Sequence, residues 1–201
     1  HDAIRISRVV DAAGFGELEQ EWDALIDESS ASGLFLGWQW QYTWWRTWSA
    51  AMGLELYLLL AHSGDRLVGI APMYLDQVHL VGRLPVRRLQ FIGNAFRKQE
   101  TVRTEYMEFI THRDFETGVC DAFLAYLAGN RQWDEFLICD MQDSSATFRA
   151  IRRLRKKYGW FVFVRDADRG TRVQTRGSFA DYLSGLGRHT RLKLYNRRGY
   201  L

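Results

Sequence analysis

Two carboxylates and a phenol lie within four positions of the chain, at Glu105, Tyr106 and Glu108, in the segment EYMEFIT. A carboxylate in such a place can accept a proton from a nucleophile, directly or through one water molecule. The segment is typical of a β-strand over 105–111, and side chains alternate across a strand. Tyr106 and Glu108 then share one face, and Glu105 and Met107 share the other. Only one of the two carboxylates can therefore face a cleft as a general base; the alternative is a solvated edge strand.

The other residues that commonly carry chemistry are scattered. The five histidines form no cluster, and no Ser/His/Asp or Cys/His arrangement can be assembled from the sequence. The two cysteines, Cys120 and Cys139, form no Cys-x-x-Cys and have no histidine beside them. We therefore expect neither a metal site nor a disulfide scaffold, and the cysteine usage favours a reducing cytoplasm.

Aromatic residues crowd into one short segment, because LGWQWQYTWWRTW (36–48) holds five of the eight tryptophans. At 100° per residue they cover more than half of a helix perimeter, whereas a surface helix needs an apolar arc of about 100°. The pattern predicts a helix covered on two sides, with Trp45 and Trp48 buried. The alternative is that one stripe lines a substrate groove, with Trp40, Trp44 and Arg46 as the candidate residues.

Composition places the chain among globular proteins, with 201 residues of which 47% are hydrophobic and 25% charged. The longest apolar run, residues 56–61, is too short to cross a bilayer. No membrane partner and no secretion signal are expected.

Charge is divided unevenly along the chain. Residues 1–148 hold 12 Lys/Arg and 21 Asp/Glu, whereas residues 149–201 hold 15 and 3. The basic end could face a nucleic acid, a phosphorylated cofactor or the acidic part of the same protein, or it could be a solvated helix face. A nucleic acid is not favoured, because most aromatic residues after Trp160 are expected to be buried.

The order of predicted elements indicates an α+β (mixed α/β) protein with a mixed β-sheet flanked by helices. Strands are predicted at 4–10, 86–93, 105–111, 135–141 and 160–165, with a hairpin in 54–75 that turns at 63–65. Helices are predicted after strand 4–10, over 36–48, within 114–130 and from Phe148 to Tyr158. Ser178 and Asp181 form a capping box that opens a helical stretch leading into the basic segment 188–201.

This order is similar to that of the GNAT superfamily of N-acetyltransferases. Four phrases sharpen the resemblance: EWDALIDESSASGLFLGWQWQYTWWRTW (21–48), RLVGIAPMYL (66–75), RRLQFIGN (87–94) and FADYLSGLGRHTRLKLYNRR (179–198). They resemble the CelD-like acetyltransferases of cellulose and exopolysaccharide biosynthesis. Members of that branch resemble two GNAT-type halves in tandem, as in FemAB-like proteins. The resemblance implies a GNAT-like domain over 1–177, followed at 178–201 by a basic connector helix to a second half.

The resemblance also implies the chemistry: an N-acyltransferase, or its N-terminal half, acting on an amine or hydroxyl of a sugar or small metabolite. Acetyl-CoA or another acyl-CoA would be the donor, held mainly by the second half. The family's pyrophosphate signature, Gln/Arg-x-x-Gly-x-Gly/Ala, matches Gln90, Gly93 and Ala95, although a strand end and turn is the simpler interpretation because no helical period follows. The alternative function is a non-catalytic GNAT-like module that shapes an acceptor groove or binds a partner.

Overall fold

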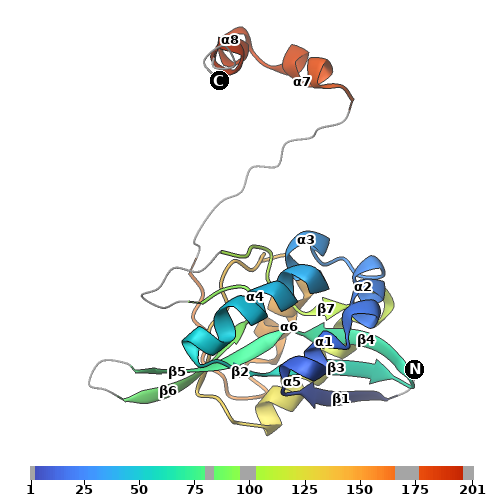
Figure 1. Ribbon diagram of the computed structural model, residues 1–201, viewed down its shortest axis with the longest axis vertical. Coiled ribbons are helices and arrows are strands. Elements are labelled where there is room, and N and C mark those ends of the chain that lie inside the picture. The colour runs from blue at the N-terminus through green and yellow to red at the C-terminus, as the bar shows by residue number, and fades with distance from the viewer. Residues whose placement is uncertain (1–2, 80–83, 96–102, 166–176, 197–201) are drawn as a thin grey trace. The chain divides into compact units, whose positions relative to one another are not determined.

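The computed structural model describes residues 3–79, 84–95, 103–165 and 177–196 (Figure 1). The chain forms two compact units, His1–Val164 and Arg165–Leu201. The first unit contains both β-sheets and most of the helices.

The first unit follows an α+β order, which confirms the class expected from the sequence. Its strands are β1 (Ile4–Val9), β2 (Glu55–Leu56), β3 (Leu58–Ser63), β4 (Arg66–Ala71), β5 (Met73–His79), β6 (Pro85–Phe91), β7 (Ile110–Thr111) and β8 (Glu135–Phe136). Its helices are α1 (Ala12–Gly16), α2 (Glu19–Asp27), α3 (Gly33–Leu36), α4 (Trp38–Met52), the 3-10 turn η1 (Arg113–Phe115), α5 (Glu116–Gly129) and α6 (Ala146–Leu154).

The strands form two four-stranded sheets, in the orders β1-β3-β4-β7 and β2-β5-β6-β8. All described pairs are antiparallel except β6 with β8, which is parallel, so the second sheet is mixed as predicted. Two continuous segments of the chain run from one sheet into the other: β2 leads into β3 at Tyr57, and β4 leads into β5 at Pro72. The Tyr57 amide donates to the Met73 carbonyl at 2.9 Å, so the ladder continues across the crossover.

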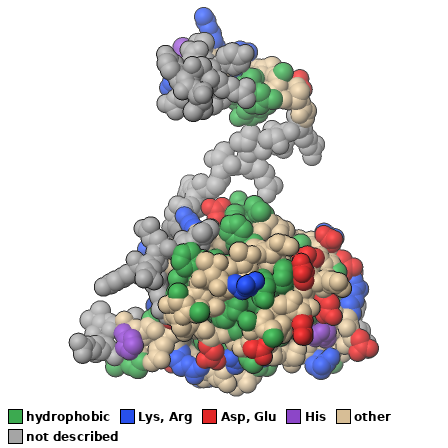
Figure 2. All heavy atoms as spheres, in the orientation of Figure 1, with side chains coloured by type: hydrophobic (Ala, Val, Ile, Leu, Met, Phe, Trp, Pro, Cys, Tyr) green, Lys and Arg blue, Asp and Glu red, His purple; other side chains and the backbone are tan. Residues whose placement is uncertain are grey.

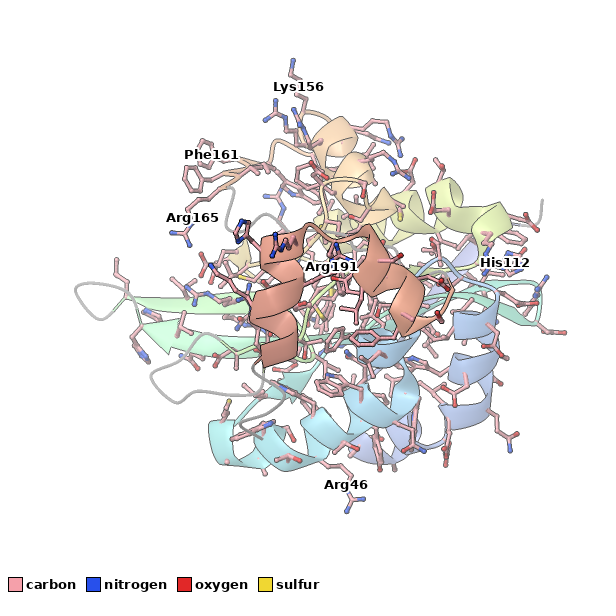
Figure 3. The ribbon with its side chains drawn as sticks, turned by 90° about the horizontal axis from the view of Figure 1, so that it is seen from above. Arg46, His112, Lys156, Phe161, Arg165 and Arg191 are labelled. Carbon is pink, nitrogen blue, oxygen red and sulfur yellow. The ribbon has the colours of Figure 1, made fainter. Side chains whose placement is uncertain are left out.

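Helices lie on both sides of the sheets, α1 to α4 on one side and α5 and α6 on the other (Figures 1 and 3). Helix α5 packs closely on β4, because a Cβ added at Gly69 of β4 would lie 2.3 Å from the Val119 side chain of α5. On the face shown in Figure 2, acidic side chains gather toward α1 and α2.

Helix α4 confirms the predicted helix and the burial of Trp45, whereas the predicted burial of Trp48 is only partial. Trp45 is buried and Trp48 is half-buried. One side of α4 meets α1, where the Trp38 indole N–H donates to the Phe15 carbonyl at 3.1 Å. The other side meets β5, where Trp44 stacks on Tyr74 with ring centroids 5.7 Å apart. The wide aromatic arc is therefore covered on two sides.

The second unit contains α7 (Phe179–Gly185) and α8 (Arg188–Asn196). The Ser178 hydroxyl accepts from the Asp181 amide and the Asp181 carboxylate accepts from the Ser178 amide, so the predicted capping box is present. The exposed cations Arg188, Arg191 and Lys193 lie on α8. The rest of the basic segment, 197–201, falls outside the described residues.

Two strand predictions are wrong over part of their length and a third is wrong throughout. Of 105–111 only Ile110–Thr111 is a strand, and of 135–141 only Glu135–Phe136. Residues 160–165 belong to no strand. The first is interrupted by the left-handed Tyr106, and in the second the Leu137 amide still donates to the Leu89 carbonyl at 3.0 Å beyond the strand.

Candidate functional site

Glu108 is the carboxylate whose surroundings suit proton transfer. Its neighbours in the chain, Met107 and Phe109, are buried, and the Phe109 amide donates to Thr147 Oγ1 at 2.9 Å. This bond fixes the segment against the first turn of α6. The pKa of Glu108 is raised to about 7, chiefly by burial and also by the Glu116 carboxylate, whereas the Arg149 guanidinium lowers it. A carboxyl with such a pKa is partly deprotonated at neutral pH and can act as acid or base.

Glu116 and Arg149 form the charged surroundings of Glu108. Glu116 begins α5, and Arg149 on α6 pairs with it at 3.2 Å. Both come from helices that follow Glu108 in the chain. Sequence reasoning missed them, because only tertiary packing brings them to Glu108. The acidic residue at the start of the predicted helix was the one available signal.

The three sequence candidates do not lie as a regular strand would place them. Tyr106 has φ of 60°, a left-handed conformation that is costly for a bulky residue. Glu105 and Tyr106 are consequently both exposed, and the expected alternation across 105–108 is wrong. The Tyr106 ring lies 6.1 Å from that of Phe35 in α3, whereas Glu108 is influenced by α5 and α6.

The raised pKa of Glu108 predicts a pH-dependent stability. Folding favours the protonated carboxyl, so ionisation of Glu108 lowers the free energy of unfolding. This loss is absent below the ordinary value of 4.5, grows between 4.5 and about 7, and is complete above that pH. Glu108→Gln removes the ionisation, so the variant should be more stable than the wild type at pH 8 and equal to it near pH 4. Urea unfolding at both pH values measures this. Glu105→Gln, at an exposed position, should leave the free energy of unfolding unchanged at both pH values. Equal effects of the two substitutions would contradict the environment described for Glu108.

The signature residues Gln90, Gly93 and Ala95 lie at the end of β6 and the turn that follows. Gly93 has φ of +118°, and a Cβ there would lie 2.7 Å from Thr104 Oγ1. The Thr104 hydroxyl donates to the Gly93 carbonyl at 2.7 Å, and the Asn94 side chain makes two bonds of 2.8 Å with the Thr104 backbone. Thr104 therefore occupies the side of Gly93 on which a Cβ would lie. The Gly93 carbonyl and the Asn94 side chain are thus already bonded to Thr104.

Gln90 nevertheless has an unusual environment. It is buried, and neither polar atom of its amide has a protein partner. It lies opposite Tyr74 in the β5–β6 ladder, on the face where Trp44 stacks. The Trp44 indole N–H also lacks a protein partner.

Replacement of Gln90 should reveal the cost of that amide. An unsatisfied buried polar group costs about 1–3 kcal/mol, so Gln90→Met should raise the free energy of unfolding by about 1–2 kcal/mol. Gln41→Met is the matched control, because the buried Gln41 amide donates to the Phe35 carbonyl at 2.8 Å. This control should be destabilised, as measured by urea unfolding. Equal losses in the two variants would mean that the Gln90 amide is satisfied in solution.

The candidate groove residues occupy three different environments. Trp40 donates from Nε1 to Thr104 Oγ1 at 3.0 Å and packs edge-on against Phe35. Trp44 is buried against β5, and Arg46 is exposed and points away from the fold (Figure 3). The structure thus brings Trp40 and Trp44 toward the β6 turn and does not bring Arg46 there.

A second left-handed residue, Asp140 with φ of 55°, supports the same region. Its carbonyl accepts from the Met107 amide at 3.1 Å, and its carboxylate pairs with Arg103. The left-handed Asp140 is thus bonded to Met107, the residue that follows the left-handed Tyr106. No sequence pattern indicated either conformation.

Among the described residues, no group of three or more His, Cys, Asp or Glu side chains could hold a metal ion. In that same part of the chain, no helix is both long and apolar enough to cross a membrane.

No protein-family model and no curated protein matches this chain. Several solved structures are similar to it at low identity. The ribosomal-protein-alanine N-acetyltransferase of Brucella melitensis biovar Abortus 2308 is 14% identical, with a TM-score of 0.39, over 86% of this chain and 98% of that one. The aminoglycoside 6'-N-acetyltransferase AAC(6')-Ih of Acinetobacter baumannii is 11% identical, with a TM-score of 0.41, over 86% and 100%. A predicted acetyltransferase with acetyl-CoA from Clostridium acetobutylicum is 12% identical, with a TM-score of 0.36, over 85% and 96%. What each of them binds or acetylates is a property of that protein.

Proposed function

We propose that this chain is the acceptor-activating part of a GNAT-type N-acyltransferase, with Glu108 as its general base. The observation that carries the proposal is the half-buried Glu108 carboxyl, whose pKa of about 7 matches proton transfer at neutral pH. The reaction class comes from the resemblance of the four sequence phrases to CelD-like acetyltransferases.

Glu108 has a defined role in this scheme. Its carboxylate accepts a proton from the acceptor amine. The freed nitrogen lone pair then forms the new bond to the acyl carbon, while the carbon–sulfur bond of the thioester breaks and coenzyme A leaves as its thiolate. The hydrogen bond from the Phe109 amide to the Thr147 hydroxyl holds the backbone next to Glu108 in place. The Arg149 guanidinium favours the charged form of the Glu108 carboxyl. The acceptor in this proposal is an amine or hydroxyl of a sugar or small metabolite, with exopolysaccharide synthesis in the cytoplasm as its setting.

The donor acyl-CoA belongs mainly to a second GNAT-like half, reached through the basic segment 178–201. Thr104 occupies the space beside Gly93, which supports placing the coenzyme elsewhere. The same observation favours a second candidate function, a non-catalytic GNAT-like module that shapes an acceptor groove.

Two measurements separate these candidates. Both use the protein together with the proposed second half: thiol release from acetyl-CoA is followed with glucosamine as the acceptor, and acetyl-CoA is titrated calorimetrically. Amine-dependent thiol release that depends on Glu108 supports the acyltransferase. No release and no heat of binding, from a preparation shown to be folded, favour the non-catalytic module.

A further inference from the structure

The segment Phe161–Val164 exposes large hydrophobic side chains. Phe161, Phe163 and Val164 are 93%, 79% and 52% exposed. Single exposed apolar residues are common, but three in one short segment indicate an interaction site. The sequence WFVFV alternates aromatic and β-branched residues, which is the composition of a strand.

The backbone of the same segment also lacks partners. Within the described part of the chain, residues 161–164 form no strand or helix and make no backbone hydrogen bond, whereas the preceding Trp160 amide donates to the Arg155 carbonyl at 2.8 Å. Strand-type residues with unpaired N–H and C=O groups are a template for pairing with another strand.

An ordered aromatic base supports this segment. The Trp160 ring lies 4.9 Å from that of Tyr158 and 6.0 Å from that of Trp133. Trp133 lies two residues before the short strand β8, which is an edge of its sheet. The apolar residues that follow β8, Leu137 and Ile138, are half-buried, although their sequence is typical of a buried strand.

The flank of the segment is basic. Arg152, Lys156 and Lys157 are exposed on and just after α6, and no acidic residue occurs between 149 and 164. Lys156 and Phe161 both point away from the fold (Figure 3). Two copies of the segment would bring like charges together, so charge complementarity selects a different partner that carries acidic residues.

We propose that Phe161–Val164 docks an added β-strand from a partner protein, with apolar residues at alternate positions and acidic residues between or beside them. A polypeptide is favoured over a lipid surface, because a strand can pair the free backbone groups whereas lipid leaves them unsatisfied. This site is independent of the proposed acyl transfer and of Glu108.

A fluorescent nine-residue peptide of alternating glutamate and valine tests the site. Its anisotropy should show saturable binding to the full 201-residue chain in 0.1 M salt, and the matched lysine–valine peptide should not bind. The double variants Phe161→Ser/Phe163→Ser and Lys156→Glu/Lys157→Glu should each weaken binding at least tenfold. Leu34→Ser, which replaces a side chain 68% exposed on α3, should leave it unchanged.

Hydrogen exchange supplies the second readout, because the amides of residues 161–164 should gain protection only when the glutamate–valine peptide is bound. Failure of the wild type to bind this peptide overturns the proposal. Unchanged binding of the peptide by the Phe161→Ser/Phe163→Ser variant also overturns the proposal. Self-association through this segment, or sedimentation with phosphatidylglycerol vesicles in place of peptide binding, assigns the surface to a different partner and also overturns the proposal.

Discussion

Replacing Glu108 with glutamine is expected to lower the rate of amine-dependent acyl transfer by about 10²- to 10⁴-fold, the usual contribution of a positioned general base. Glutamine keeps the shape of the side chain and cannot accept the proton. The wild-type rate should rise with pH and level off above about 7, following deprotonation of Glu108. The variant should lose this dependence. Thiol release measured between pH 5.5 and 9 gives both quantities.

Stability separates this effect from misfolding, because Glu108→Gln should be at least as stable as the wild type at pH 8. Glu105→Gln provides the matched control: it changes a neighbouring, exposed carboxylate and should keep at least a third of the rate. A rate for Glu108→Gln within threefold of the wild type would remove Glu108 from the mechanism.

Trp22→Ala should cause the largest loss of stability, about 3–5 kcal/mol in the free energy of unfolding, as aromatic truncations in cores do. Trp22 of α2 is fully buried and stacks on Phe15 with centroids 5.4 Å apart. Its indole N–H donates to the Leu36 carbonyl at 2.8 Å, so truncation also leaves a buried acceptor unpaired.

Urea unfolding monitored by circular dichroism measures this loss. Trp48→Ala on α4 is the comparison, because that ring is half-buried and should cost clearly less. A loss below 2 kcal/mol for Trp22→Ala would mean that the helical layer collapses to fill the space.

Features encoded by local sequence were predictable. The aromatic arc of 36–48 specified helix α4, the Gly64 turn specified the β3–β4 hairpin, and Ser178 with Asp181 specified a helix start. Each depends on residues within a few positions of one another, where periodicity and capping act.

Features encoded by contacts between distant residues were not predictable. The strand expected over 105–111 is broken by the left-handed Tyr106, and the next residue, Met107, bonds to Asp140 from a later part of the chain. The pKa of Glu108 depends on Glu116 and Arg149, which reach it through the packing of α5 and α6. The sequence could therefore nominate the carboxylate but not its environment.

The passage of two chain segments between sheets, at Tyr57 and Pro72, has a consequence for the cooperativity of unfolding. Neither sheet can lose its order while the other keeps it, because β2–β3 and β4–β5 each lie in both. The slowest-exchanging amides of the two sheets should therefore open in one global event with the same free energy, and the sheets should not behave as separate folding units. A destabilising substitution in either sheet would then lower the protection of both by the same amount.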